Sequence, residues 1–169
     1  ALRGALAAAR GDERLGVIHS LGDLRDQEAA GARVPLLDDA GDAISGAAAV
    51  ALGRIGAAEA VDPLRRYRAK ASRGRRAAAD EACIEIAYRL IEQGRAGDAA
   101  RIFGELGSSP EEPVRFAAFR GLLRALPDAQ ARARIDEALR DADPRRREVV
   151  NRLLRERFPG EPGKAPGAD

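Results

Sequence analysis

Residues 43–71 read AISGAAAVALGRIGAAEAVDPLRRYRAKA and contain the clearest local pattern of the chain. Apolar residues recur at helical spacing in both halves of this stretch: Ile44, Ala48, Ala51, Leu52 and Ile55, then Val61, Leu64, Tyr67 and Ala71. Spacings of three and four residues are typical of an amphipathic helix that buries one face. The stretch therefore predicts two amphipathic helices joined by a tight turn.

A second copy of this pattern lies earlier in the chain. Leu21-Gly22 matches Leu52-Gly53, 31 residues further on, and an apolar helical stretch precedes each pair. A short segment with a proline follows each one, at 34–37 and at 61–64. Self-similarity at such a period is the signature of stacked helical units. We therefore expect a repeated unit of helix, turn and helix.

Helix starts can be recognised by their first residues. In Asp143-Pro144 the aspartate suits the free N–H groups of a first turn, and proline needs no N–H donor there. Pro35 and Pro63 should mark helix beginnings for the same reason. These signals predict first helices of each pair at about 13–21, 43–55, 76–92, 113–125 and 144–157, second helices at about 27–38, 59–71, 96–107 and 129–141, and a partial helix at about 2–9.

The composition supports an all-α fold. The 169 residues include 37 Ala, 17 Leu and 27 Arg, but only 7 Val, 8 Ile and no Thr. Such a chain forms helices readily and sheets poorly. No apolar run approaches the roughly 18 residues of a membrane span, so no membrane partner is expected. The formal net charge is only +2 and does not by itself demand an anionic partner.

The repeated units resemble HEAT repeats, in particular the bacterial HEAT-like type. The resemblance lies in Leu21-Gly22, in residues 52–56 and 59–64, and in the linker Asp141-Ala142-Asp143-Pro144. Residues 82–107 instead resemble one tetratricopeptide unit, with small, bulky and aromatic residues around Gly94. The resemblance implies a right-handed α-solenoid of about four to five antiparallel helix pairs over residues 1–158. It also implies a concave face that holds a protein partner.

The two ends of the chain carry separate expectations. Residues 159–169 are rich in Pro and Gly and have nothing to bury, so a disordered tail is expected there. The chain starts with helix-like sequence and lacks an initial Met, which indicates a fragment of a longer protein. The sequence leaves the cellular compartment and the oligomeric state open.

No constellation of catalytic or metal-binding residues is present in the sequence. His19 is the only histidine and Cys83 the only cysteine, which excludes a Cys/His zinc site. We interpret His19 as a residue of an amphipathic helix and Cys83 as a core residue. Asp38, Asp39 and Asp42 lack the spacing of a calcium loop and are better explained as helix caps. We therefore expect no cofactor, no metal and no enzymatic activity.

A cluster of basic residues is the most distinctive local feature of the sequence. The segment Arg65–Arg76 holds seven Arg and Lys residues and no acid. Its candidate partner-binding residues, predicted to lie on or near the concave surface, are Arg65, Arg66, Lys70 and Arg73. Such a cluster binds an anionic partner, or it is a solvated helix end where cations suit the dipole.

Three hypotheses for function follow from this pattern. The favoured one is a non-catalytic scaffold that binds another protein on the concave face. The first alternative is binding of nucleic acid or another anion through the segment Arg65–Arg76, although the chain has only two Tyr and no Trp for base stacking. The second alternative is a HEAT-like enzyme of the bilin lyase kind, for which no residue-level signature is present.

Overall fold

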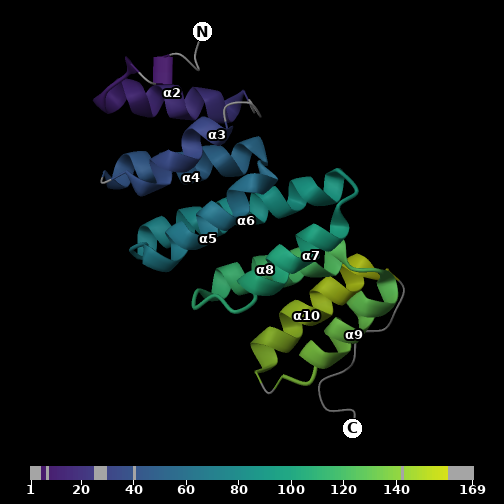
Figure 1. Cartoon of the computed structure of the whole chain (residues 1–169). Helices are drawn as coiled ribbons and strands as arrows, with labels where there is room; N and C mark the ends of the chain where they lie inside the picture. The colour runs from purple at the N-terminus through teal and green to yellow at the C-terminus, as the bar shows by residue number, and fades with distance from the viewer. Residues whose placement is uncertain (1–4, 7, 25–29, 40, 142, 160–169) are drawn as a thin grey trace.

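The computed structural model describes residues 5–6, 8–24, 30–39, 41–141 and 143–159. These residues form helices and connecting turns, and no strand occurs among them. Figure 1 shows the helices stacked one after another from the N-terminus to the C-terminus. In chain order they are α2 (Gly11–Asp23), α3 (Ala30–Arg33), η2 (Val34–Asp38), α4 (Asp42–Ile55), η3 (Ala58–Ala60), α5 (Val61–Lys70), α6 (Arg73–Glu92), α7 (Ala96–Leu106), α8 (Glu112–Ala125), α9 (Asp128–Ala138) and α10 (Pro144–Arg157).

The helix starts follow the local chemistry of the sequence. The Asp143 carboxylate accepts a hydrogen bond of 2.9 Å from the backbone N–H of Arg145, as a helix cap should. Pro144 occupies the first helical position of α10, and Pro63 lies in the first turn of α5. Gly56 ends α4 with φ of +74°, a left-handed conformation that favours glycine. The predicted turn between α4 and α5 is thereby confirmed.

One predicted helix is wrong. The range 27–38 was expected to form a single helix, but its described part contains the four-residue α3 followed by the 3₁₀ helix η2. Pro35 lies in the first turn of η2, where it cannot donate the hydrogen bond that would continue an α-helix. Residues 27–29 lie outside the described residues, as do parts of the predicted helix at 2–9.

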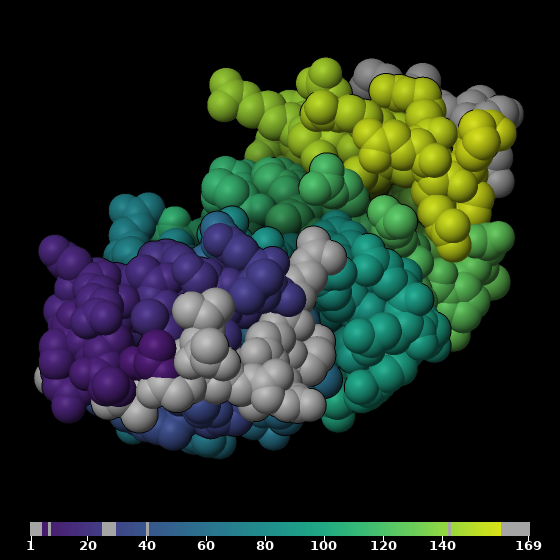
Figure 2. Space-filling view, turned by 90° about the horizontal axis from the view of Figure 1, so that it is seen from above, coloured from purple at the N-terminus to yellow at the C-terminus, as the bar shows by residue number. Residues whose placement is uncertain are grey.

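The helices form two rows. Helices α2, α4, α6, α8 and α10 follow one another in one row, and α3 with η2, α5, α7 and α9 form the other. Seen end on, the C-terminal helices are displaced sideways from the N-terminal helices, so the stack turns along its length (Figure 2). This is the predicted all-α solenoid; the hand of its superhelix remains a prediction.

The first row is the more closely spaced. Gly22 of α2 faces Ala51 of α4, and a Cβ atom on Gly22 would lie 3.0 Å from the Ala51 Cα. Gly53 of α4 faces Ala82 of α6 in the same way, with 2.7 Å to the Ala82 Cα. Helices α5 and α7 of the second row meet at few points by comparison. In a curved stack the row with the shorter spacing lies on the inside, so we expect the row of α2, α4, α6, α8 and α10 to lie on the concave side.

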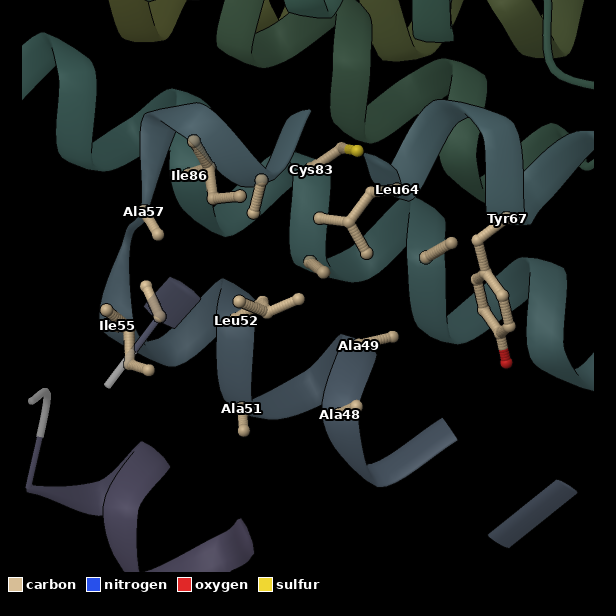
Figure 3. Close-up of a cluster of buried hydrophobic side chains, with 14 of the residues drawn as sticks. Ala48, Ala49, Ala51, Leu52, Ile55, Ala57, Leu64, Tyr67, Cys83 and Ile86 are labelled. Carbon is tan, nitrogen blue, oxygen red and sulfur yellow. The ribbon is translucent and has the colours of Figure 1, made fainter. Parts of the chain in front are cut away.

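The hydrophobic core lies between the two rows. In Figure 3 the side chains of Leu52 and Ile55 from α4 meet Leu64 from α5 and Ile86 from α6. All four are almost completely buried, and many of their neighbours are alanines, which allow the helices to approach closely. A second, smaller cluster joins α8, α9 and α10 around Leu123, Ile135 and Leu154. The C-terminal pair of helices thus has a core largely of its own.

One ion pair is buried beneath the turn between α5 and α6. Arg68 of α5 pairs through Nε with Oδ1 of Asp80 on α6, and the Asp80 side chain is completely buried. Burial raises the pKa of Asp80, while Arg68 and Ser109 act in the opposite direction. The folded chain therefore takes up a proton at Asp80 at a higher pH than the unfolded chain does. The contribution of Asp80 to stability therefore grows as the pH falls from the raised pKa of the folded chain toward the ordinary pKa of an aspartate.

Replacing Asp80 with asparagine is expected to remove this pH dependence. The difference between the free energies of unfolding of the wild type and of Asp80→Asn should increase in favour of the wild type as the pH is lowered. The rise is expected from about pH 7 toward about pH 4, near the ordinary pKa of an aspartate. Urea unfolding followed by circular dichroism at several pH values measures this difference. Glu81→Gln, an exposed neighbour on α6, is the matched control. A difference that stays flat, or an equal rise in the control, would contradict the role of Asp80.

Candidate functional site

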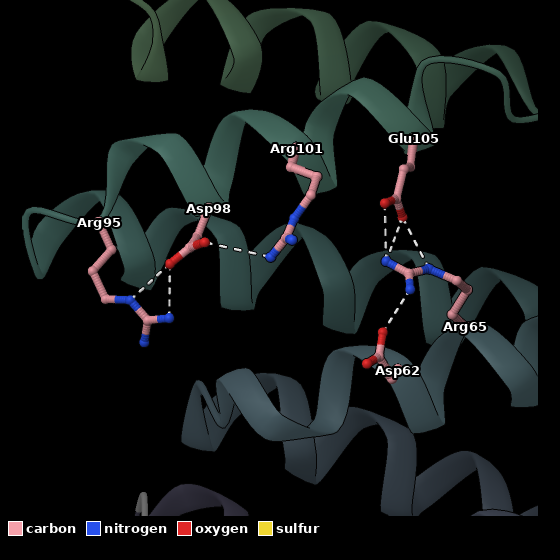
Figure 4. Close-up of polar contacts among 6 residues, drawn as sticks. All are labelled: Asp62, Arg65, Arg95, Asp98, Arg101 and Glu105. Atoms are coloured by element: carbon pink, nitrogen blue, oxygen red, sulfur yellow. Dashed lines mark hydrogen bonds and ion pairs between the residues drawn. The ribbon is translucent and has the colours of Figure 1, made fainter.

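The predicted basic cluster is largely paired with acidic side chains. Arg65 donates three hydrogen bonds through Nε and Nη2 to the Glu105 carboxylate on α7, at 3.0, 2.9 and 2.7 Å. It donates a fourth through Nη1, of 2.5 Å, to Asp62 on its own helix (Figure 4). The hydrogen bonding of Arg65 to the Glu105 carboxylate raises the pKa of Arg65 above its ordinary value. Arg65 therefore bridges α5 and α7 and offers little free charge to a partner.

Arg73 belongs to a different helix from the rest of the cluster. Arg65, Arg66 and Lys70 lie on α5, which ends at Lys70, whereas Arg73 begins α6. Its guanidinium donates to Glu111 at 2.9 and 3.0 Å. This contact holds the pKa of Glu111 below its ordinary value. It also offsets the unfavourable position of a cation at a helix N-terminus.

The placement of the cluster on or near the concave surface remains a prediction. Helix α5 belongs to the more widely spaced row, called the outer row below, and Arg66 and Lys70 project from it. Both side chains are exposed, and within the described residues neither takes part in an ion pair. They are the two members of the predicted site that remain available to a partner.

The concave row carries a groove that the sequence did not reveal. Its N-terminal half is a depression of about 440 Å³ that runs across α2, α4 and α6. Its charged walls are tied together by ion pairs: Arg54 to Asp23 at 2.5 Å and Arg89 to Glu92 at 3.5 Å. Its lining residues are Gly22, Asp23, Arg54, Glu85, Tyr88, Arg89 and Glu92.

The C-terminal half of the groove runs across α6, α8 and α10. It is a depression of about 480 Å³. Tyr88 lines both halves, so the two depressions adjoin at this side chain. The Tyr88 ring packs edge-on against Phe103 of α7, with ring centroids 5.2 Å apart. The residues that line this half are Tyr88, Arg120, Leu123, Arg124, Leu153, Glu156 and Arg157.

The two halves differ in charge. Acidic residues outnumber basic ones in the N-terminal half, where both arginines are already paired. In the C-terminal half the basic residues outnumber Glu156, the acid that lines it. The arrangement suits recognition of a polar, extended ligand better than enclosure of a small molecule.

His19 and Cys83 lie apart from the groove lining. His19 is exposed on α2. Cys83 is buried in the same core cluster as Leu64, as predicted (Figure 3), and burial raises the pKa of its thiol to about 12. Within the described residues, no group of three His, Cys, Asp or Glu side chains is placed to hold a metal ion. In the same part of the chain, no helix combines the length and apolarity needed to cross a membrane.

Cys83 is expected to be inert in the folded chain. With a thiol pKa of about 12, its thiolate fraction at mildly alkaline pH falls on the order of a thousandfold below that of a free cysteine. Ellman's reagent, added with and without urea, measures the difference through the only cysteine of the chain. Reaction of the native chain at the rate of the unfolded chain would show that Cys83 is accessible and ionised.

Two rows of stacked helices with a buried core between them define a helical-repeat protein, in which each unit is supported by its neighbours. Residues 1–84 match the family model of HEAT repeats. The resemblance expected from residues 42–71 is confirmed. Residues 85–107, most of the tetratricopeptide-like unit, lie beyond the match, and that assignment remains a prediction.

Two solved structures are similar to the chain at low sequence identity. One is an engineered protein from a structural genomics consortium, with 18% identity, a TM-score of 0.49, and coverage of 90% of this chain and 76% of that one. The other is a designed armadillo repeat protein, with 16% identity, a TM-score of 0.44, and coverage of 92% and 98%. No curated protein matches the chain.

Proposed function

We propose that the chain is a non-catalytic scaffold that binds another protein along the groove of its concave row. The observation that carries this proposal is the meeting of two depressions at Tyr88, which extends one groove across α2, α4, α6, α8 and α10. Helical-repeat folds of this kind commonly bind protein partners along such extended concave surfaces.

Tyr88 has the properties of a central binding residue. Tyrosine and arginine are enriched among the residues that contribute most to protein interfaces. The edge-on contact with Phe103 holds the Tyr88 ring in place, so little conformational entropy is lost when a partner covers it. The charged residues of α4, α6 and α8 surround it as a polar rim.

The groove is a better candidate than the predicted basic cluster. Arg65 and Arg73 are held by Glu105 and Glu111, so an anion would have to displace existing ion pairs. Among the four predicted site residues, nucleic-acid binding would rest on Arg66 and Lys70 alone. The raised pKa of Cys83 and the exposed position of His19 also favour a binding role over a catalytic one.

Site-specific photo-crosslinking tests the proposal. A photoreactive amino acid at Glu92, on the groove, is compared with one at Arg66, on the outer row, in cells that produce the protein. We expect a discrete crosslinked protein from position 92 and not from position 66. Tyr88→Ala should reduce its yield about tenfold, as for loss of a central interface residue.

Two further observations make the crosslinking result decisive. Circular dichroism shows whether Tyr88→Ala remains folded, and Arg54→Glu on the exposed rim provides a second variant that leaves the core intact. The same products from positions 92 and 66, or yields unaffected by both variants, would mean that the groove is not the binding surface.

A further inference from the structure

Arg120 and Arg124 form an unpaired cationic wall in the C-terminal half of the groove. Both are exposed on α8, and neither makes a hydrogen bond or ion pair with any residue that the structure describes. Arg157, which lines the same half of the groove, donates to Asp128 at 2.6 Å. Arg120 and Arg124 are therefore the two arginines of this lining whose guanidinium groups have no partner among the described residues.

The spacing of the two arginines places them side by side. Residues four apart on a helix project from the same face, about 6 Å apart along its axis. Like charges at this spacing repel each other, and a bound anion relieves that repulsion. Leu123 of α8 and Leu153 of α10 are buried and line the same half of the groove, so the wall stands next to an apolar floor. Glu156 is the acid that lines this half of the groove, and it leaves the local balance positive.

The distribution of charge along the chain reinforces this local feature. Residues 112–158 contain twelve arginines and eight acidic residues, although the whole chain has a net charge of only +2. The N-terminal half of the groove has the opposite balance and retains Glu85, whose carboxylate lies over Gly53. A partner that follows the groove therefore meets a negative end and a positive end.

On this basis we infer that α8 and α10 bind an acidic, extended segment of the protein partner. In an extended chain, side chains two residues apart point to the same side at about 6.6 Å. This matches the axial separation of Arg120 and Arg124, so each can receive one carboxylate and form a charge-assisted, forked hydrogen-bond pair. The recognised pattern is acidic, any residue, acidic. This inference rests on the proposed function, because it names the chemistry of that partner.

A short labelled peptide tests the inference directly. The probe is a fluorescein-labelled peptide of alternating Glu and Ala, and fluorescence anisotropy measures its affinity for the full chain at moderate salt. The test variant is the double substitution Arg120→Glu and Arg124→Glu. The control is the double substitution Arg66→Glu and Lys70→Glu on the outer row, which changes the net charge by the same amount. A neutral pair, Arg120→Gln and Arg124→Gln, shows the effect of lost attraction without added repulsion.

The inference predicts that charge reversal at Arg120 and Arg124 weakens peptide binding by about tenfold or more, and that the control changes it less than about twofold. The neutral pair should fall between them. Equal weakening by test and control would reduce the effect to net charge and overturn the inference. Absence of peptide binding, or tighter binding of a single-stranded RNA of equal charge, would also overturn it. If the Glu92 crosslink persists in those cases, the groove proposal stands and only the acidic partner is refuted.

Discussion

Replacing Phe103 with alanine is expected to lower the free energy of unfolding by about 3–5 kcal/mol, the usual cost of deleting a buried aromatic ring. Phe103 is 1% exposed and lies between Tyr88 of α6 and Gly121 of α8, so it joins three helices of the stack. Urea unfolding followed by circular dichroism measures the loss. Phe116→Ala, at a half-buried position of α8, should cost clearly less.

Gly121 provides an internal check on this prediction. A Cβ atom at Gly121 would lie 2.3 Å from Cε1 and Cζ of Phe103, so Gly121→Ala alone forces the buried ring to shift. Overpacking of this kind costs about 1–3 kcal/mol. In the Phe103→Ala background the new methyl group enters the vacated space, and its cost should largely disappear. Additive effects of the two substitutions would show that ring and glycine are not in contact.

Gly53→Ala is expected to destabilise the chain by about 1–3 kcal/mol through overpacking. The added Cβ would lie 2.7 Å from the Ala82 Cα and 3.0 Å from its Cβ, and a backbone atom cannot rotate away as a side chain can. Helices α4 and α6 must therefore move apart. The loss occurs although alanine is the better helix former by up to about 1 kcal/mol.

Gly46, on the same helix, is the matched control. No atom lies within 4 Å of the position of its Cβ. Gly46→Ala should therefore stabilise the chain by about 0.5–1 kcal/mol through helix propensity alone. Thermal and urea unfolding of both variants then give opposite signs. A stabilised Gly53→Ala variant would contradict the close spacing of the concave row.

Local signals in the sequence were sufficient to predict most of the fold. The apolar spacing around Leu52 and Leu64 predicted α4 and α5, and Asp143-Pro144 predicted the start of α10 at the residue where it begins. These features depend on residues within one or two helical turns, which is why they can be read from sequence. The range 27–38 failed because Pro35 stops an α-helix in the middle of an otherwise favourable apolar pattern.

Contacts between helices that are far apart in sequence could not be predicted from local patterns of residues. Arg65 meets Glu105, 40 residues away, and Arg73 meets Glu111, 38 residues away. A segment without acidic residues therefore looked cationic in sequence although its charges are compensated in space. The sequence also did not reveal which row is more closely spaced, because that depends on glycine-to-alanine contacts between successive helices.

The groove residues carried no recognisable signal in sequence. Tyr88 and Arg120 belong to different helices, each with the ordinary pattern of an amphipathic helix. Only the stacking of α6, α8 and α10 brings these side chains to one surface. A stricter reading of Arg120 and Arg124, which are four residues apart with no acidic residue between them, would have identified α8 as a second candidate helix.

Hydrogen–deuterium exchange on the complex with the crosslinked partner shows which row of helices the partner covers. If the partner binds in the groove, exchange slows in α6 and α8, on the concave row, and stays unchanged in α5 and α7 of the outer row. Slower exchange in α5 and α7, with α6 and α8 unaffected, would contradict it.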